Sequence, residues 1–235
     1  MTRITNTPDA HVALSHNLVG QRLGRKGRDT RGRIIAATER LLAGPPDKPV
    51  SLSAVAREAS LAMTTLYLYF SDLVELLLAV LEPVIASAEE NHIALLREYW
   101  IEDSLDAHCL AFVTAYHKFW VRHARILHLR NNFADNNDER MGQHRINSSL
   151  PLIKLLILQM GGEPTVRSTP TTAMATVLVT GVERLVTVST SGMVASQLED
   201  LSSHTRNLLE AQARLVALGI REGRKLQGLR QGAPA

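Results

Sequence analysis

The feature that most constrains the fold is the stretch TTLYLYFSD at residues 64–72, which has β propensity but lies between two segments of helical period. In a strand, alternate residues would share one face, whereas in a helix Leu66 and Phe70 would share a face as i, i+4 neighbours. A lone strand is unstable, and Asp72 followed by Glu75 forms a capping-box pattern that starts a new helix. The stretch is therefore predicted to be a short helix with Leu66 and Phe70 facing inward.

Two helices are predicted ahead of this stretch. Residues 30–43 carry apolar side chains at helical spacing, and Gly44 with the following PPDKP ends that helix, because proline has no amide hydrogen to donate. Ser51 is expected to cap a second helix of about eight residues, with apolar positions at i, i+3, i+4 and i+7. Two short helices joined by a turn, the second with hydroxyl and aromatic groups outside, describe a helix-turn-helix.

The predicted outer face of the second short helix carries Tyr67, Leu68 and Tyr69. Because the two tyrosine rings are about 160° apart on such a short helix, at least one of them is expected to be exposed. An outward Leu68 is explained either by contact with a thymine methyl group or by plain tolerated exposure.

A basic cluster precedes these helices. Such a cluster attracts phosphate groups, which makes it a candidate nucleic-acid arm, and a solvated tail is the alternative. Three glycines in the same stretch favour a flexible segment over residues 1–29. The cluster contains one acidic residue, Asp29, and six basic residues: Arg22, Arg25, Lys26, Arg28, Arg31 and Arg33.

The composition is that of an ordinary globular protein, with 45% apolar and 21% charged residues and a formal net charge of +3. The single cysteine, Cys109, excludes an internal disulfide framework and is compatible with a reducing cytosol. No signal-peptide pattern is present, and the apolar run around residues 173–182 is too short to cross a bilayer. A soluble, cytoplasmic protein without membrane contact is therefore expected.

Beyond residue 83 the sequence predicts further helices without a recognisable motif. A loop is expected at residues 161–170 and a flexible tail at 226–235. The predicted helices cover residues 84–99, 104–123, 124–135, 138–160, 171–191 and 196–225.

One of these helices has an aromatic face that is a candidate lining for a ligand pocket, with a plain hydrophobic core as the alternative. The candidate pocket residues are Cys109, Phe112, Tyr116, Phe119 and Trp120. The histidines of the same region are not spaced as a compact ligand set, so no metal site is predicted.

The sequence contains few of the motifs that are typical of enzymes. Helical bundles hold di-iron sites with two Glu-x-x-His pairs, and this chain has one such pair, Glu89 and His92. It has no phosphate-cradling glycine loop, no nucleophile elbow and no Cys-x-x-Cys pair. No catalytic residue and no cofactor is predicted, and a helical-bundle metalloenzyme remains the less favoured alternative.

Residues 30–81 resemble the DNA-binding domain of TetR-type transcriptional regulators. The matching positions are Thr30-Arg31, Ala36-Ala37, Ser51, Val55-Ala56, Ala59, Thr65-Leu66-Tyr67, Tyr69-Phe70 and the leucine-rich residues 76–81. The sequence departs from the family at Ser60 (usually the turn glycine), Ala62 (usually a serine cap), Thr64 (usually glycine or alanine) and Leu73 (usually a lysine that meets a phosphate). Ser60 would then have to adopt a conformation that favours glycine.

The resemblance implies an all-α fold in two parts. A three-helix helix-turn-helix domain with its fourth helix would cover residues 30–82, and a larger helical ligand-binding and dimerisation domain would cover residues 83–225. It also implies a homodimer through residues 171–191 and 196–217, a near-palindromic double-stranded DNA operator, and a repressor that a small-molecule effector releases.

The same resemblance names candidate DNA contacts. In addition to the basic residues Arg22, Arg25, Lys26, Arg28 and Arg31, they are Ser51, Met63, Thr64, Thr65, Tyr67, Leu68 and Tyr69. A dimer of this fold that has lost DNA binding and acts through protein contacts is the alternative, and the departures at Ser60, Ala62 and Leu73 support it.

Overall fold

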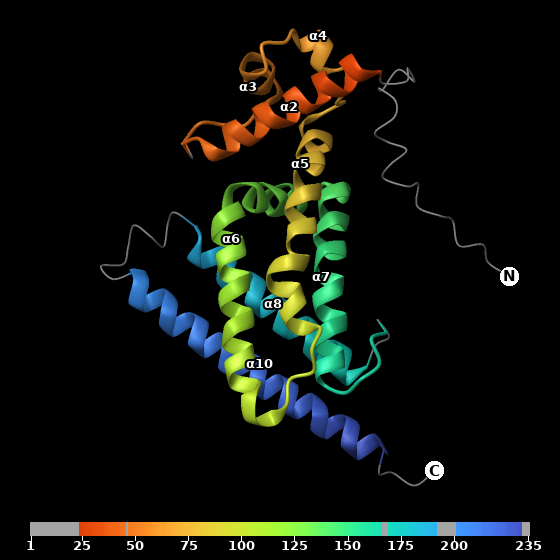
Figure 1. Ribbon diagram of the computed structural model, residues 1–235, viewed down its shortest axis with the longest axis vertical. Helices are drawn as coiled ribbons and strands as arrows, with labels where there is room; N and C mark the ends of the chain where they lie inside the picture. Colours follow the sequence, from red (N-terminus) through yellow and green to blue (C-terminus); the bar gives the residue numbers. More distant parts are fainter. Residues whose placement is uncertain (1–23, 46, 166–168, 192–200, 232–235) are drawn as a thin grey trace, which may run out of the picture. The chain divides into compact units, whose positions relative to one another are not determined.

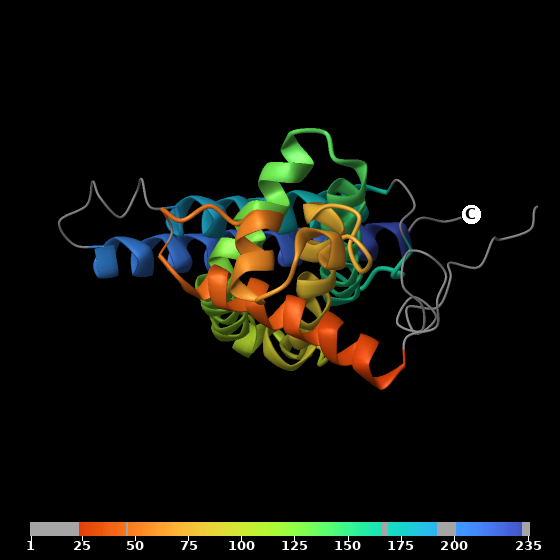
Figure 2. The ribbon, with the colours of Figure 1, turned by 90° about the horizontal axis from the view of Figure 1, so that it is seen from above.

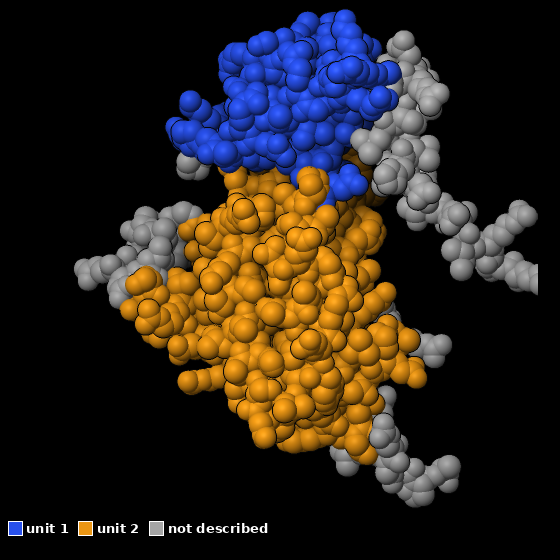
Figure 3. All heavy atoms as spheres, in the orientation of Figure 1, with its two compact units in different colours: residues 1–82 blue, residues 83–235 orange. Residues whose placement is uncertain are grey.

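Among the residues it describes, the computed structural model has helices and no strand, which confirms the all-α prediction. Residue contacts divide the chain into two compact units, unit 1 at residues 1–82 and unit 2 at residues 83–235 (Figure 3). The division made from the sequence also placed a boundary after residue 82. The described residues are 24–45, 47–165, 169–191 and 201–231.

Unit 1 contains helices α2 (Arg25–Ala43), α3 (Leu52–Glu58) and α4 (Met63–Leu66), and the first part of α5 (Leu73–Ser87) (Figure 1). Helix α2 begins at Arg25, so the prediction of a flexible segment is wrong for residues 25–29. Gly24 takes an extended N-cap conformation, and the arginines and lysine that follow are good helix formers. The rest of the predicted arm, residues 1–23 with Arg22, lies outside the described residues.

An apolar core holds unit 1 together. The prediction that Leu66 and Phe70 face inward is confirmed, since their exposed fractions are 0% and 1%. They pack with buried side chains of three other helices, namely Ile34, Ala37, Val55, Ala56, Ala59 and Leu76.

Helix α4 is shorter than the predicted helix from Met63 to Phe70. A single α turn ends at Leu66, and the chain continues in tighter turns, with the Leu68 amide donating to the Thr65 carbonyl at 3.2 Å. Aromatic residues lose side-chain freedom in an α-helix, which favours this early end. The predicted cap of the next helix is present, because Asp72 Oδ1 accepts from the Glu75 amide at 2.8 Å. The Glu75 carboxylate, however, accepts from the amide and hydroxyl of Ser71, at 2.7 Å each.

Unit 2 is built from four long helices and an irregular segment (Figure 1). The long helices are α6 (Leu105–Asp135), α7 (Glu139–Gln159), α8 (Pro170–Ser189) and α10 (Leu201–Gln231). The irregular segment follows α5 and contains the π-helix η1 (Glu89–Ile93) and the 3-10 helices η2 (Ala94–Leu96) and η3 (Glu102–Ser104). It replaces much of the predicted helix 84–99.

The helix ends in unit 2 differ from the prediction at two places. The two helices predicted on either side of residue 123 are one helix with a kink, since His123 has non-helical φ −116° and ψ 18°. Helix α10 extends to Gln231, so the predicted flexible tail is wrong for residues 226–231, where Leu, Gln and Arg are good helix formers.

The irregular segment is fixed to α7 by Gln159, which is 1% exposed. Its Oε1 accepts from the Trp100 amide at 2.9 Å. Its Nε2 donates to the carbonyls of Leu96 at 3.0 Å and Glu98 at 2.7 Å. One carboxamide therefore satisfies three backbone groups that no regular helix pairs.

Helix α8 lies beside α10, as Figures 1 and 2 both show. By length and composition alone α8 could cross a membrane, with a mean hydropathy of 1.2 over 18 residues. Core helices of soluble proteins pass the same test, and α8 buries seven side chains in unit 2, among them Ala175, Val179 and Val186.

Candidate nucleic-acid interface and ligand cavities

The turn between α3 and α4 is built around Ser60, which has φ +54°, as predicted from the glycine-like position. A side chain in this left-handed region costs about 1 kcal/mol. The turn is held by the Leu61 amide, which donates to the Ala56 carbonyl at 2.9 Å, and by Arg33 Nη2, which donates to the Ala59 carbonyl at 2.7 Å. Arg33 was not a predicted site residue, because its role depends on a contact 26 positions away.

Side chains that face solvent follow directly on this turn. Tyr67 is 49% exposed and Leu68 is 41% exposed, whereas Tyr69 is half-buried against the core, which confirms that at least one tyrosine ring is outside. Thr64 is exposed as well. Hydroxyl, aromatic and apolar groups therefore share one small surface, which we call the α4 surface.

Three other predicted contact residues have structural roles or partial burial. Ser51 caps α3 by accepting from the Ala54 amide at 3.2 Å, as predicted. Met63 and Thr65 are half-buried at the edge of the α4 surface. Ala62 provides no side-chain cap for α4.

The basic residues of α2 divide into two groups. Arg25, Lys26 and Arg28 are exposed on the first turns of the helix. Arg31 is half-buried, with its guanidinium 5.0 Å from the centre of the Phe70 ring, and burial lowers its pKa. Arg31 therefore also packs against the residue that anchors the α4 surface.

Unit 2 contains a partly open cavity of about 240 Å³, which we call the inner cavity. It is lined by residues between 85 and 93 and by side chains of α6 and α7, and Glu183 reaches it from α8. Three predicted pocket residues, Tyr116, Phe119 and Trp120, line it.

The other two predicted pocket residues do not line this cavity. Cys109 and Phe112 are 0% and 1% exposed in the surrounding core. Burial raises the pKa of the Cys109 thiol to about 12, so the thiol is protonated at neutral pH. The Phe112 ring lies next to the Tyr116 ring, with a centroid distance of 6.2 Å.

His92 also lines the cavity and was not among the predicted pocket residues. It is 3% exposed, and its ring lies edge-on to Tyr116 and Phe119, with centroid distances of 4.7 Å and 5.0 Å. Burial lowers its pKa to about 4, although Glu89 opposes the shift. The sequence signal was present as the Glu89–His92 pair, but that pair was considered only as half of a metal motif.

A buried ion pair closes one side of the inner cavity. Arg130, 4% exposed, donates from Nη2 to Glu183 Oε1 at 2.9 Å and from Nη1 to Ser148 Oγ at 3.1 Å. Burial lowers the pKa of Arg130, and the Glu183 carboxylate opposes this. The two charges compensate each other inside the unit.

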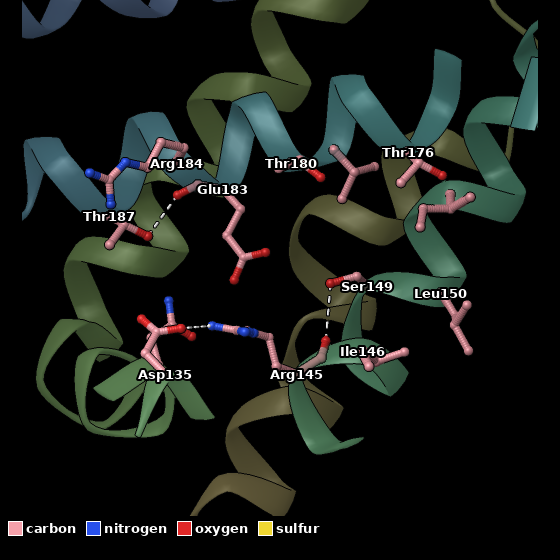
Figure 4. A pocket seen from close by; sticks show the side chains of 13 residues that line it. Asp135, Arg145, Ile146, Ser149, Leu150, Thr176, Thr180, Glu183, Arg184 and Thr187 are labelled. Carbon is pink, nitrogen blue, oxygen red and sulfur yellow. Dashed lines mark hydrogen bonds and ion pairs between the residues drawn. The ribbon is translucent and has the colours of Figure 1, made fainter. Parts of the chain in front are cut away.

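A second and more open hollow, of about 510 Å³, lies between α7, α8 and the end of α6. Figure 4 shows the Glu183 side chain pointing into it, opposite the ion pair of Arg145 and Asp135, whose atoms are 2.7 Å apart. This outer hollow shares Ser149 and Glu183 with the inner cavity, so the two spaces are neighbours.

Helices α8 and α10 also form an apolar groove of about 410 Å³. Its exposed side chains include Val177, Leu215 and Leu218, which are 68%, 55% and 58% exposed. Gly219 lets the helices approach closely, since a Cβ there would lie 2.6 Å from Leu178 Cδ1. Within the described part of the chain, no three His, Cys, Asp or Glu side chains gather to hold a metal ion.

Comparison with known proteins rests on structure. No known protein family matches the sequence, and no curated protein matches it. Among solved structures, a TetR family transcription regulator from Marinobacter aquaeolei VT8 aligns with a TM-score of 0.53 and 16% sequence identity, covering 83% of this chain and 98% of that one. The chain thus has the all-α fold of a TetR family transcription regulator.

Proposed function

We propose that this chain is a DNA-binding transcription regulator that acts as a homodimer in the cytoplasm and is released from its operator by a small molecule. The α4 surface carries the proposal. Leu66 and Phe70 anchor it from inside, while Thr64, Tyr67 and Leu68 remain outside. The shared fold with a TetR family transcription regulator supports the same function.

In the proposed complex, the α4 surface enters the major groove of double-stranded DNA. Hydroxyl groups of Thr65, Tyr67 and Tyr69 contact phosphates, and Leu68 contacts a thymine methyl group. The exposed Arg25 and Lys26 add phosphate contacts, which replace the one that Leu73 cannot make.

The apolar groove of α8 and α10 supports a homodimer. Exposed Val177, Leu215 and Leu218 would be covered by the same helices of a second copy, giving a symmetric interface. Twofold symmetry of the dimer then requires a near-palindromic operator.

The path of α5 supports release by a ligand. This helix begins in unit 1 at Leu73 and ends in unit 2 at Ser87, and the next residues line the inner cavity. A ligand that shifts this segment acts on the DNA-binding unit through the helix itself. Thermodynamic linkage requires that operator DNA weaken ligand binding by the same factor.

A gel-shift assay of the full chain with the promoter region beside its own gene tests the proposal. We expect a retarded complex that Leu68→Glu abolishes, since a carboxylate in the groove repels phosphates, and that Val121→Glu on α6 preserves. A folded dimer that binds no DNA would instead support the alternative, a dimer that acts through protein contacts.

Sedimentation equilibrium tests the dimer separately. The double variant Leu215→Glu with Leu218→Glu places charges on the apolar groove and should sediment as a monomer. Val121→Glu, which changes an equally exposed residue elsewhere, is the matched control. A dimeric double variant would place the interface on another surface.

A further inference from the structure

The inner cavity is large enough for a molecule with one ring. An apolar cavity of ~150 Å³ holds benzene, so the volume of about 240 Å³ admits a ring with small substituents. A larger polycyclic molecule would have to displace the surrounding helices.

The walls of the cavity favour an aromatic ring. Tyr116, Phe119 and Trp120 face it from α6, and the His92 ring completes this side from η1. Aromatic rings attract one another in edge-to-face and offset arrangements, beyond the effect of apolar burial. The His92 contacts with Tyr116 and Phe119 already have this geometry.

One polar atom of this wall is without a partner. Nδ1 of His92 is buried and makes no hydrogen bond, which is unusual for a buried nitrogen. A neutral imidazole nitrogen donates or accepts according to its tautomer. A hydroxyl group can satisfy it in either tautomer, because a hydroxyl both donates and accepts.

The charged residues that line the cavity are all paired. Arg130 and Glu183 form the buried pair described above, and Glu89 is paired with Arg97 at 2.5 Å. A charged ligand would lose its hydration without gaining a free counter-charge. The cavity is therefore suited to a neutral molecule.

We propose that the inner cavity binds a neutral phenol-type molecule, with its ring against Tyr116, Phe119 and Trp120 and its hydroxyl group hydrogen-bonded to Nδ1 of His92. The phenol hydroxyl has an ordinary pKa of about 10 and stays neutral at physiological pH. The outer hollow adjoins the cavity at the shared residues Ser149 and Glu183.

The position of His92 gives such a ligand a direct effect on the chain. His92 lies in η1, which begins at Glu89, two residues after α5 ends at Ser87, and π-helical turns recur at functional sites. The regulatory consequence rests on the proposed function, whereas the binding itself does not.

Calorimetric titration of the full chain, without DNA, tests the binding with three probes of similar size: para-cresol, toluene and 4-methylbenzoate. Para-cresol should bind roughly tenfold tighter than toluene, the effect of one hydrogen bond to a buried group. The benzoate should bind more weakly than both. Equal binding of para-cresol and toluene, tightest binding of the benzoate, or no binding of para-cresol would each overturn the proposal.

His92→Phe keeps the ring and removes the nitrogen. It should lower para-cresol affinity to that of toluene and leave toluene affinity unchanged. His108→Phe, at a histidine that stacks on Trp100 and does not line the cavity, should keep the tenfold preference. A preference that survives in His92→Phe would contradict the assigned hydrogen bond.

A spectroscopic measurement covers the case in which His92→Phe does not fold. In the unaltered chain, para-cresol should shift the ¹⁵N resonance of His92 Nδ1, and toluene should not. An unchanged ¹⁵N resonance at saturating para-cresol would contradict the proposal.

The DNA-binding assay then separates the two proposals. If para-cresol binds as expected but leaves operator affinity unchanged, the ligand class stands and the release mechanism fails. If the chain binds its operator but not para-cresol, the proposed regulator stands and the ligand class fails.

Discussion

The two units differ in what they bury. Among the described residues of unit 1, the one buried polar side chain is Thr38, whose hydroxyl donates to the Ile34 carbonyl at 2.9 Å. Unit 2 instead buries His92, Arg130, Gln159, Thr171, Thr172 and Gln212. An apolar core depends on volume and shape, whereas the cost of a buried polar group depends on the particular groups that hydrogen-bond to it. The stability of unit 1 therefore depends mainly on apolar packing, whereas that of unit 2 also depends on individual polar contacts.

The largest expected effect tests the polar interior of unit 2. Arg130→Ala should lower the free energy of unfolding by about 4 kcal/mol, because it leaves Glu183 without its buried partner. Arg145→Ala removes a more exposed pair with Asp135 and should cost less than about 1 kcal/mol. Urea titrations of both variants measure the difference. Equal costs would mean that the Arg130 pair is effectively hydrated and that the two units do not differ as described.

The apolar core of unit 1 is tested by Leu66→Ala. We expect a loss of about 3 kcal/mol, from the removed methyl groups and the cavity that they leave. Leu68→Ala, on the exposed α4 surface, should change the stability by less than about 0.5 kcal/mol. Hydrogen exchange of the unit 1 amides measures the stability change in each of the two variants. Similar protection in the two variants would show that the sides of this short helix were assigned wrongly.

A pH series tests the buried histidine. The pKa of His92 is lowered to about 4 from its ordinary 6.5, so the unfolded chain binds this proton more readily at intermediate pH. Stability should therefore fall as pH drops through the window between these values, by roughly 2 kcal/mol between about pH 7 and pH 5 for this group.

The contribution of His92 to this pH dependence is measured by comparison with His92→Phe. The free energy of unfolding of this variant should fall less between about pH 7 and pH 5. His144, whose pKa burial also lowers to about 4, is retained in both proteins and cancels in the comparison. Parallel stability profiles for the two proteins would show that His92 is not held neutral by burial.

The smallest effect concerns DNA. Tyr67→Phe removes an exposed hydroxyl and should weaken binding to all DNA sequences by about 1 kcal/mol, the scale of one net hydrogen bond. Tyr99→Phe, at a similarly exposed tyrosine of unit 2, should leave binding unchanged. Fluorescence anisotropy with operator and unrelated duplexes measures both. An unaltered affinity in Tyr67→Phe would remove this hydroxyl from the interface.

Much of unit 1 could be predicted from the sequence because its signals are local. The spacing of Leu66 and Phe70, the cap at Ser51 and the strain at Ser60 each depend on a few neighbouring residues. The early start of α2 and the early end of α4 were missed, because helix ends depend on small differences in propensity.

The cavity of unit 2 could be predicted only in part. The aromatic spacing on α6 identified Tyr116, Phe119 and Trp120, but it could not show which aromatic residues face the space and which lie behind it. His92 became a cavity residue only through its contacts with α6, and Arg130 through Glu183, 53 positions later in the chain. Both contacts join residues on different helices, so the spacing of residues within one helix does not predict them.

The π-helical segment η1 also has a consequence for comparing related genes. A π turn contains about one residue more than an α turn, and each α-helical residue advances by about 100° around the axis. A relative that lacks one codon between Glu89 and Ile93 would continue as an ordinary helix and present a different side chain where His92 now lies. An alignment gap of a single position here would therefore change which side chain lines the inner cavity, even where every residue of α6 is identical.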